Sequence, residues 1–212
     1  MTARAFDAVL CDVDGVIRFF DGAGVAALER AAGVGEGSTA GVGFASENDL
    51  PLLLGRIGKA EWVESIARGL VGRVSEAQAR GLAEAFANSP FWADEVAVGL
   101  LRQVREHCRV VLVTNATVWL DEDLARLGLT ELAHEVVNSS LVGSAKPDRR
   151  IYEIAAERAG VAPERCLFVD DRQENVDAAV ALGMTGVLYR GSEDLRRALA
   201  PVLGRRVVRP GR

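Results

Sequence analysis

Histidine, cysteine and lysine are scarce in this sequence, and the scarcity narrows the chemistry available to the chain. The two histidines, His107 and His134, fall in connecting segments, so no histidine-rich zinc site is expected. Cys11, Cys108 and Cys166 lack metal-binding spacing and lie in or beside apolar runs, which indicates buried thiols rather than nucleophiles. Any bound metal should therefore be a hard cation held by oxygen atoms.

Lysine supplies only Lys59 and Lys146 among 25 basic residues, and arginine supplies the others. Because a compact ammonium and a planar guanidinium serve different purposes, a rare lysine points to a specific task. We attribute Lys59 to compositional chance and keep Lys146 as a candidate functional residue.

The sequence also lacks a basic excess and long apolar runs. Its 30 acidic and 25 basic residues give a net charge of −5, which argues against a nucleic-acid-binding surface. No apolar run approaches the roughly 20 residues of a membrane span, and residues 1–7 contain no signal-peptide core. We expect a cytoplasmic protein, monomeric or homodimeric, without nucleic-acid or membrane partners.

The patterning predicts an α/β fold, a doubly wound parallel sheet of Rossmann-like type with a small helical domain inserted. Residues 8–11 are continuously apolar, as in a strand that is buried on both faces. Residues 21–89 are mainly helical, and from Asp94 helices and strands alternate, which is typical of crossover units. The predicted units are a core of residues 1–20 and 90–204, a helical domain of residues 21–89, and a basic tail of residues 205–212.

Individual elements follow from the same patterns. Further strands are expected over residues 109–114, 135–138, 166–170 and 185–189, and helices over 24–32, 59–70, 75–87, 94–107, 120–128, 148–159, 174–182 and 192–203. The glycine-rich stretch 33–43 has no preceding strand and no Lys-Ser/Thr end, so a phosphate-binding loop is rejected. A flexible loop is expected there instead.

Polar residues follow the predicted strands at the edge where open α/β sheets bind ligands. The set comprises Asp12, Asp14, Thr114, Asn115, Asp170 and Asp171, with Lys146 on a loop that can reach them. Carboxylates this close repel one another without a cation, and Mg²⁺ suits a site of carboxylate and phosphate oxygens.

This inventory suits phosphoryl transfer. An aspartate beside the metal can attack phosphorus and form an aspartyl-phosphate, while a second aspartate transfers protons. Thr114 and Lys146 can stabilise the charge on the phosphoryl oxygens. Asn115 has an alternative interpretation as a turn residue that ends a strand.

Four stretches resemble, in order, the four motifs of the haloacid dehalogenase-like hydrolase superfamily. They are Asp12-Val13-Asp14-Gly15-Val16, Thr114-Asn115, Lys146-Pro147 followed by Ile151-Tyr152, and Asp170-Asp171-Arg172-Gln173-Glu174-Asn175-Val176. The resemblance implies that Asp12 is the nucleophile and a metal ligand, and that Asp14 is the general acid/base with its carbonyl on Mg²⁺. It implies phosphate contacts for Thr114, Asn115 and Lys146, and metal contacts for Asp170 and Asp171. By position and helicity, the inserted segment is similar to the helical cap domain of one branch.

The second aspartate favours a phosphatase over a dehalogenase, because the haloacid dehalogenases that this chain resembles generally lack an aspartate at Asp14. We therefore expect Mg²⁺-dependent hydrolysis of a small phosphate monoester. A sugar-phosphate phosphomutase and a catalytically weak phosphate-binding regulatory protein remain the alternatives. Phe19, Phe20, Arg56 and Lys59 lie in or near the inserted segment, and we expect some of them to face the active-site mouth.

Overall fold

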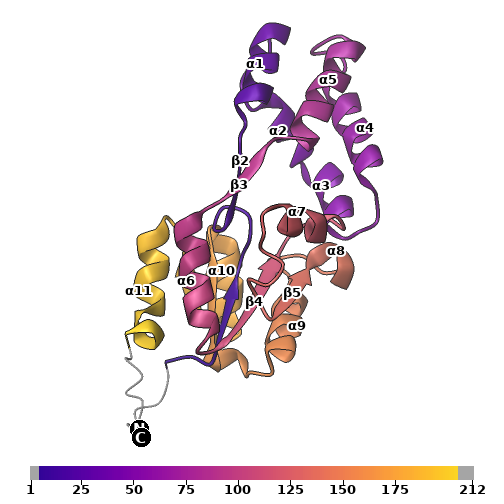
Figure 1. Cartoon of the computed structure of the whole chain (residues 1–212). Coiled ribbons are helices and arrows are strands. Elements are labelled where there is room, and N and C mark those ends of the chain that lie inside the picture. The colour runs from indigo at the N-terminus through magenta and orange to yellow at the C-terminus, as the bar shows by residue number, and fades with distance from the viewer. Residues whose placement is uncertain (1–4, 205–212) are drawn as a thin grey trace, which may run out of the picture.

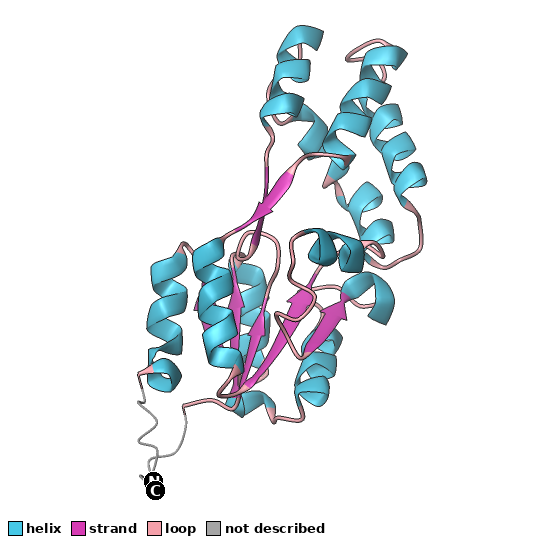
Figure 2. Ribbon diagram, in the orientation of Figure 1, coloured by secondary structure: helices cyan, strands magenta, loops and turns pink. Residues whose placement is uncertain are grey.

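A five-stranded parallel sheet forms the centre of the computed structural model, which describes residues 5–204 (Figures 1 and 2). Its strand order is β5-β4-β1-β6-β7, with β1 (Ala8–Cys11) in the middle between β4 (Arg109–Thr114) and β6 (Cys166–Asp170). β5 (Glu135–Asn138) and β7 (Thr185–Leu188) form the edges. The predicted α/β fold with a parallel sheet is confirmed, whereas the predicted basic tail, 205–212, and residues 1–4 lie outside the described residues.

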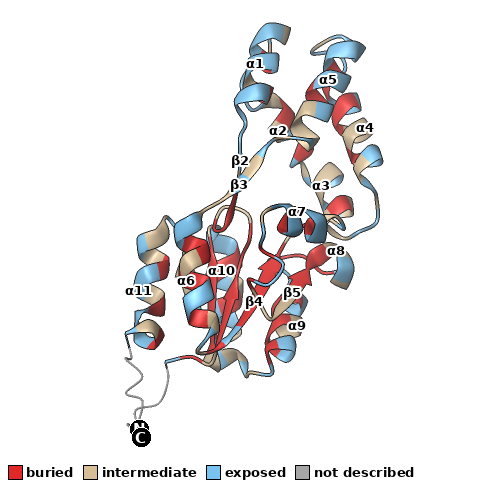
Figure 3. Ribbon diagram, in the orientation of Figure 1, coloured by how far each residue is buried: buried red, intermediate tan, exposed pale blue. Residues whose placement is uncertain are grey.

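Helices cover both faces of this sheet, which explains the continuously apolar strands. Val9 and Cys11 pack in one cluster with α6 (Glu95–Arg105) and α11 (Ser192–Leu203). Ala8 and Leu10 pack in a second cluster with α9 (Arg149–Ala159) and α10 (Gln173–Ala181). Successive residues of a strand point to opposite faces, so both sets must be apolar. Figure 3 shows the resulting buried sheet, and the three cysteines are buried free thiols as expected.

The remaining core elements are short. They are α7 (Leu120–Arg126), α8 (Ser139–Val142) and a 3-10 turn, η1 (Pro163–Arg165). In the part of the chain that the structure describes, no helix has both the length and the apolar character needed to cross a membrane.

Five helices gather beyond one end of the sheet (Figure 1): α1 (Ala23–Ala32), α2 (Ser38–Gly43), α3 (Ser46–Leu53), α4 (Lys59–Leu70) and α5 (Glu76–Ala87). We call this group the cap helices. They surround their own apolar cluster, which includes Trp62, Ile66 and Leu82. Ser75 and Gln78 form a capping box at the start of α5, because each side chain accepts a hydrogen bond from the backbone amide of the other residue.

The prediction of a flexible loop over residues 33–43 is wrong in part, because α2 occupies the second half of this stretch. The physical reason lies in α1. The buried carboxylate of Glu29 accepts hydrogen bonds from the amides of Gly37, at 2.8 Å, and Thr39, at 2.7 Å. These bonds satisfy amides at the start of α2 that have no partner within the helix.

Two short strands that the sequence did not indicate connect the cap helices to the core. β2 (Arg18–Phe20) and β3 (Phe91–Ala93) pair antiparallel and form the ribbon between the two parts of the molecule (Figure 2). Three residues are too few to show a strand periodicity, so this ribbon could not be read from the pattern. It places Arg18 directly beside the end of β1.

Candidate active site

Lys146 joins two carboxylates at the carboxyl end of the central strands. Its Nζ lies 2.7 Å from Asp12 Oδ1 and 2.7 Å from Asp170 Oδ2, and all three residues are buried. Asp12 directly follows β1, Asp170 ends β6, and Lys146 comes from the loop before α9. The rare lysine thus lies between aspartates that are far apart in the sequence.

Burial and neighbouring charges shift the pKa values of this group. Burial raises the pKa of Asp12 to about 7; Lys146 opposes the shift and Asp170 adds to it. Burial lowers the pKa of Lys146, but the two carboxylates outweigh that effect and raise it, so the ammonium stays charged. Asp12 is therefore a carboxylate whose ionisation depends on nearby positive charge.

Asp171 completes a cluster of oxygen donors. One carboxylate oxygen each of Asp12, Asp170 and Asp171 lies within 4.8 Å of the others. Burial and Asp170 raise the pKa of Asp171, as expected for acidic groups held close together. The donor set contains only oxygen and carries high negative charge, so it fits a hard divalent cation such as Mg²⁺.

Gly15 allows Asp171 to approach the turn after β1. Its φ of 81° lies in the left-handed region, and an added Cβ would lie 2.3 Å from Asp171 Oδ2. Both the backbone conformation and the close contact require glycine here.

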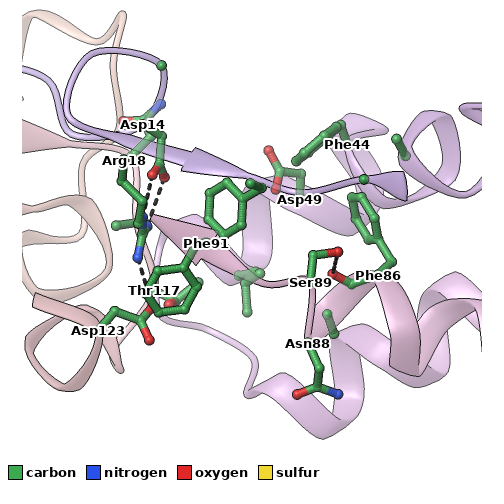
Figure 4. Close-up of a pocket in the computed structure, with 18 of the residues that line it drawn as sticks. Asp14, Arg18, Phe44, Asp49, Phe86, Asn88, Ser89, Phe91, Thr117 and Asp123 are labelled. Carbon is green, nitrogen blue, oxygen red and sulfur yellow. Dashed lines mark hydrogen bonds and ion pairs between the residues drawn. The ribbon is translucent and has the colours of Figure 1, made fainter. Parts of the chain in front are cut away.

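Asp14 points to a different partner from Asp12. The guanidinium of Arg18 donates to Asp14 Oδ1 at 2.6 Å and to Oδ2 at 2.9 Å, and its third nitrogen donates to Asp123 at 2.8 Å (Figure 4). Burial lowers the pKa of Arg18, but the two aspartates outweigh it and raise the pKa, so the buried guanidinium stays charged. Asp14 is absent from the cluster of carboxylate side chains described above.

The residues after β4 differ in their contacts. The Asn115 side chain donates to the carbonyl of Lys146 at 2.8 Å and accepts from its amide at 2.7 Å. The side chain of Asn115 therefore holds the main chain of Lys146. The expected contact of Asn115 with phosphate stays a prediction. Thr114 is fully buried, and none of the described residues forms a hydrogen bond with its hydroxyl. Thr114 is not among the residues that line the cavity beside the site, so its expected contact with phosphate also stays a prediction.

Asn175 and Arg18 are two contacts of the site aspartates whose roles the sequence did not indicate. The buried Asn175 side chain donates to Asp170 Oδ1 at 3.0 Å and to Oδ2 at 3.1 Å, and the amide of Arg172 donates to Oδ1 at 2.9 Å. These bonds fix the orientation of Asp170. Only the position of Asn175 within the fourth motif could have drawn attention to it.

A cavity of about 1220 Å³ lies between these residues and the cap helices. Its core side includes Asp12, Asp14, Asn115, Lys146 and Asp171. Its other walls come from the cap helices and the β2–β3 ribbon. Of the four residues expected near the mouth, Phe20 and Lys59 line the cavity, whereas Phe19 and Arg56 are not among its lining residues.

Comparisons with known proteins agree with this geometry. Residues 6–183 match the model of the haloacid dehalogenase-like hydrolase family. The fold is similar to a HAD family enzyme from Bacteroides thetaiotaomicron, solved in complex with magnesium and inorganic phosphate, with a TM-score of 0.65 and 21% identity over 85% of this chain and 92% of that one.

Curated relatives match over part of their length. The chain is 26% identical to flavin mononucleotide hydrolase 1 of Arabidopsis thaliana over 137 residues, 65% of this chain and 56% of the relative. It is 41% identical to glyceraldehyde 3-phosphate phosphatase of Methanopyrus kandleri over 70 residues, 32% of this chain and 30% of the relative. Since the family model spans most of the chain and its motif residues meet at one edge of the sheet, the chain belongs to the haloacid dehalogenase-like hydrolases.

Proposed function

We propose that this protein is a Mg²⁺-dependent phosphatase that hydrolyses a phosphorylated small molecule through an aspartyl-phosphate on Asp12. The observation that carries the proposal is the arrangement of Asp12, Lys146, Asp170 and Asp171 beside a cavity, with Asp14 held separately by Arg18. The curated relatives named as a flavin mononucleotide hydrolase and a glyceraldehyde 3-phosphate phosphatase support this class of reaction.

The first step would form the bond between an Asp12 carboxylate oxygen and phosphorus, as the bond to the leaving oxygen breaks. The Lys146 ammonium, 2.7 Å from Asp12, would stabilise the negative charge on the phosphoryl oxygens. Asp12, Asp170 and Asp171 would hold Mg²⁺, which supplies the positive charge that brings an anionic substrate and an anionic nucleophile together.

Proton transfer falls to Asp14. It would protonate the leaving oxygen and then accept a proton from the water that hydrolyses the acyl phosphate. Both of its carboxylate oxygens accept hydrogen bonds from Arg18, which fixes the carboxyl group in one orientation at the cavity.

Two aspartate variants test this mechanism. Asp12→Asn keeps the shape of the side chain but removes the nucleophile, so phosphate release should fall to background. Asp14→Asn keeps the nucleophile, so a good leaving group should still transfer its phosphoryl group, while breakdown of the phosphoenzyme slows by roughly 10²–10⁴-fold. Rapid quench and mass spectrometry should then detect a phosphorylated chain in Asp14→Asn and none in Asp12→Asn. A phosphoryl adduct on Asp12→Asn, or near-normal turnover by it, would contradict the mechanism.

A substrate panel separates the phosphatase from the two alternatives. Inorganic phosphate released from sugar phosphates and nucleotides supports the phosphatase. Isomerisation of a sugar phosphate without phosphate release would support a phosphomutase instead. Binding of phosphate esters with neither reaction would support a regulatory protein.

A further inference from the structure

Aromatic side chains are concentrated around the cavity. The chain has seven phenylalanines, three tryptophans and two tyrosines. Six of these line the cavity, namely Phe20, Phe44, Trp62, Phe86, Phe91 and Trp119. They come from α4 and α5, from the residue after α2, from both strands of the ribbon and from the residue before α7. Segments far apart in the sequence therefore supply one aromatic lining.

The cap contributes an aromatic group that remains open to a ligand. Phe44 and Phe86 meet edge to face with ring centroids 5.4 Å apart, and Phe86 meets Trp62 at 5.7 Å. Phe44 is nevertheless 64% exposed, although it borders a cavity. In the view of Figure 4, Asp14 and Arg18 lie at one side of the cavity and Phe44 and Phe86 at the other. A ligand whose phosphate is at Asp12 must extend toward the cap to cover these rings.

Asp49 of α3 adds a polar group beside the aromatic lining. Its side chain lines the same cavity as Phe44. Among the described residues, none donates a hydrogen bond to this carboxylate or forms an ion pair with it, and it is only partly exposed. Burial raises its pKa to about 6, and the charge of Arg172 opposes that shift. A half-buried acceptor without a partner is well placed to receive an N–H from a ligand.

The size of the cavity favours a ligand larger than a short ester. Its volume of about 1220 Å³ exceeds the roughly 300–1000 Å³ that is usual for pockets of drug-sized ligands. Asp14 and Phe44 lie at opposite sides of the cavity in Figure 4, so we expect a three-carbon phosphate held at Asp12 to make no contact with Phe44.

We propose that the preferred substrates are phosphate monoesters whose organic part is a planar heteroaromatic ring system, of nucleobase or flavin size, with an N–H donor. The phosphate lies at Asp12, the ring packs against Phe44 in the cap, and Asp49 accepts the ring N–H. This inference rests on the proposed phosphatase function and adds the substrate class. Ring stacking on one aromatic side chain changes affinity by about 5- to 150-fold, so Phe44 alone has a measurable effect.

The test compares hydrolysis of flavin mononucleotide and adenosine 5′-monophosphate with that of glycerol 3-phosphate. We expect kcat/KM for at least one aromatic ester to exceed that for glycerol 3-phosphate by tenfold or more. Phe44→Leu keeps an apolar side chain but removes the ring, so it should raise KM about tenfold for the aromatic ester and leave glycerol 3-phosphate unaffected. Preference for glycerol 3-phosphate, or an equal effect of Phe44→Leu on both substrates, would overturn the inference.

A matched control and a binding measurement keep the two proposals separate. Trp92→Leu also removes an exposed aromatic ring from the molecule, but Trp92 stacks on Phe19 and is not among the cavity-lining residues, so KM should not change. Titration of Asp12→Asn with the same three compounds, by calorimetry, measures binding without turnover. If nothing is hydrolysed, the phosphatase proposal fails; tighter binding of the aromatic compounds would still support the ligand class, and equal binding would overturn it.

Discussion

Arg18 binds Asp14 through two hydrogen bonds, at 2.6 and 2.9 Å, across four residues of the turn that follows β1. The remaining nitrogen of Arg18 reaches Asp123 on α7, and its guanidinium lies over the rings of Phe20 and Phe91. The buried guanidinium of Arg18 therefore contacts three parts of the molecule. These are the proposed acid/base group, α7 of the core, and the ribbon that leads to the cap helices. Because a guanidinium binds a carboxylate in a fixed two-point geometry, lysine cannot replace it at this position.

Arg18→Lys should reduce activity in a way that depends on the leaving group. For an alkyl phosphate, kcat should fall by at least about tenfold. The largest fall we expect is the roughly 10²–10⁴-fold that general acid–base catalysis commonly contributes. For 4-nitrophenyl phosphate, whose leaving group needs no proton, the fall should be smaller. The two rates are measured at one pH with the same preparations.

Arg165→Lys is the control for this substitution. Arg165 binds Asp7 through the same two-point geometry, at 2.9 and 3.0 Å, at the opposite end of the sheet. Its replacement should leave the ratio of the two rates unchanged. Equal losses for both substrates in Arg18→Lys would assign Arg18 a structural role only.

Gly15→Ala should weaken metal binding. The added Cβ would lie 2.3 Å from Asp171 Oδ2, and φ would stay near 81° at a cost of about 1–2 kcal/mol for a residue with a side chain. We expect the Mg²⁺ concentration for half-maximal activity to rise. Gly24→Ala is the control, because Gly24 lies in α1 and an added Cβ would meet no atom beyond its own stretch of helix within 4 Å. The Mg²⁺ requirement of this variant should not change.

Glu29→Gln should destabilise the cap helices in a pH-dependent manner. Burial raises the pKa of Glu29, but the amide hydrogen bonds of Thr39 and Gly37 outweigh it and lower the pKa. The carboxylate therefore stabilises the fold above its ordinary pKa, and this contribution is lost as the pH falls through the lowered value.

Thermal melts between pH 7 and pH 3 test that prediction. At pH 7 the Tm of Glu29→Gln should lie about 2–4 °C below that of the unmodified chain, the change that 1 kcal/mol makes at this size. The difference should shrink toward the acidic end, because protonation removes the carboxylate that the substitution replaces. Glu36→Gln, which removes an exposed carboxylate paired with Arg30, should show little change, and a constant difference for Glu29→Gln would contradict the argument.

The sequence predicted the sheet well because its three central strands are buried on both faces. Continuous apolar runs such as Val110-Val111-Leu112-Val113 identify central strands, and the polar residues that follow them must meet at one edge. For that reason the sequence placed Asp12 and Asp170 in one site, with Lys146 on a loop that can reach them, and the structure brings the three together.

Other parts of the site depend on contacts between distant residues, which leave no local pattern. Arg18 and Asp123 are 105 residues apart, and neither belongs to a recognisable spacing. Asn115 holds the main chain of Lys146, a role that its place beside Thr114 does not distinguish from phosphate binding. The number of cap helices could not be predicted from the sequence, because the conformation of residues 33–43 depends on hydrogen bonds to Glu29 of the preceding helix.

The cluster of Asp12, Asp170 and Asp171 leads to a prediction about stability as well as activity. These carboxylates face a single ammonium, that of Lys146, so a divalent cation that binds them should favour the folded chain. Mg²⁺ at 100 times its Kd should add about 2.7 kcal/mol and raise the Tm by about 5–10 °C. Chelator should remove both this increase and phosphatase activity, and added Mg²⁺ should restore them.

Asp171→Asn should lose the Tm increase, whereas Asp177→Asn, an exposed change on α10, should retain it. An equal Mg²⁺-induced increase in both variants would show that the cation binds elsewhere, because only Asp171 belongs to the cluster.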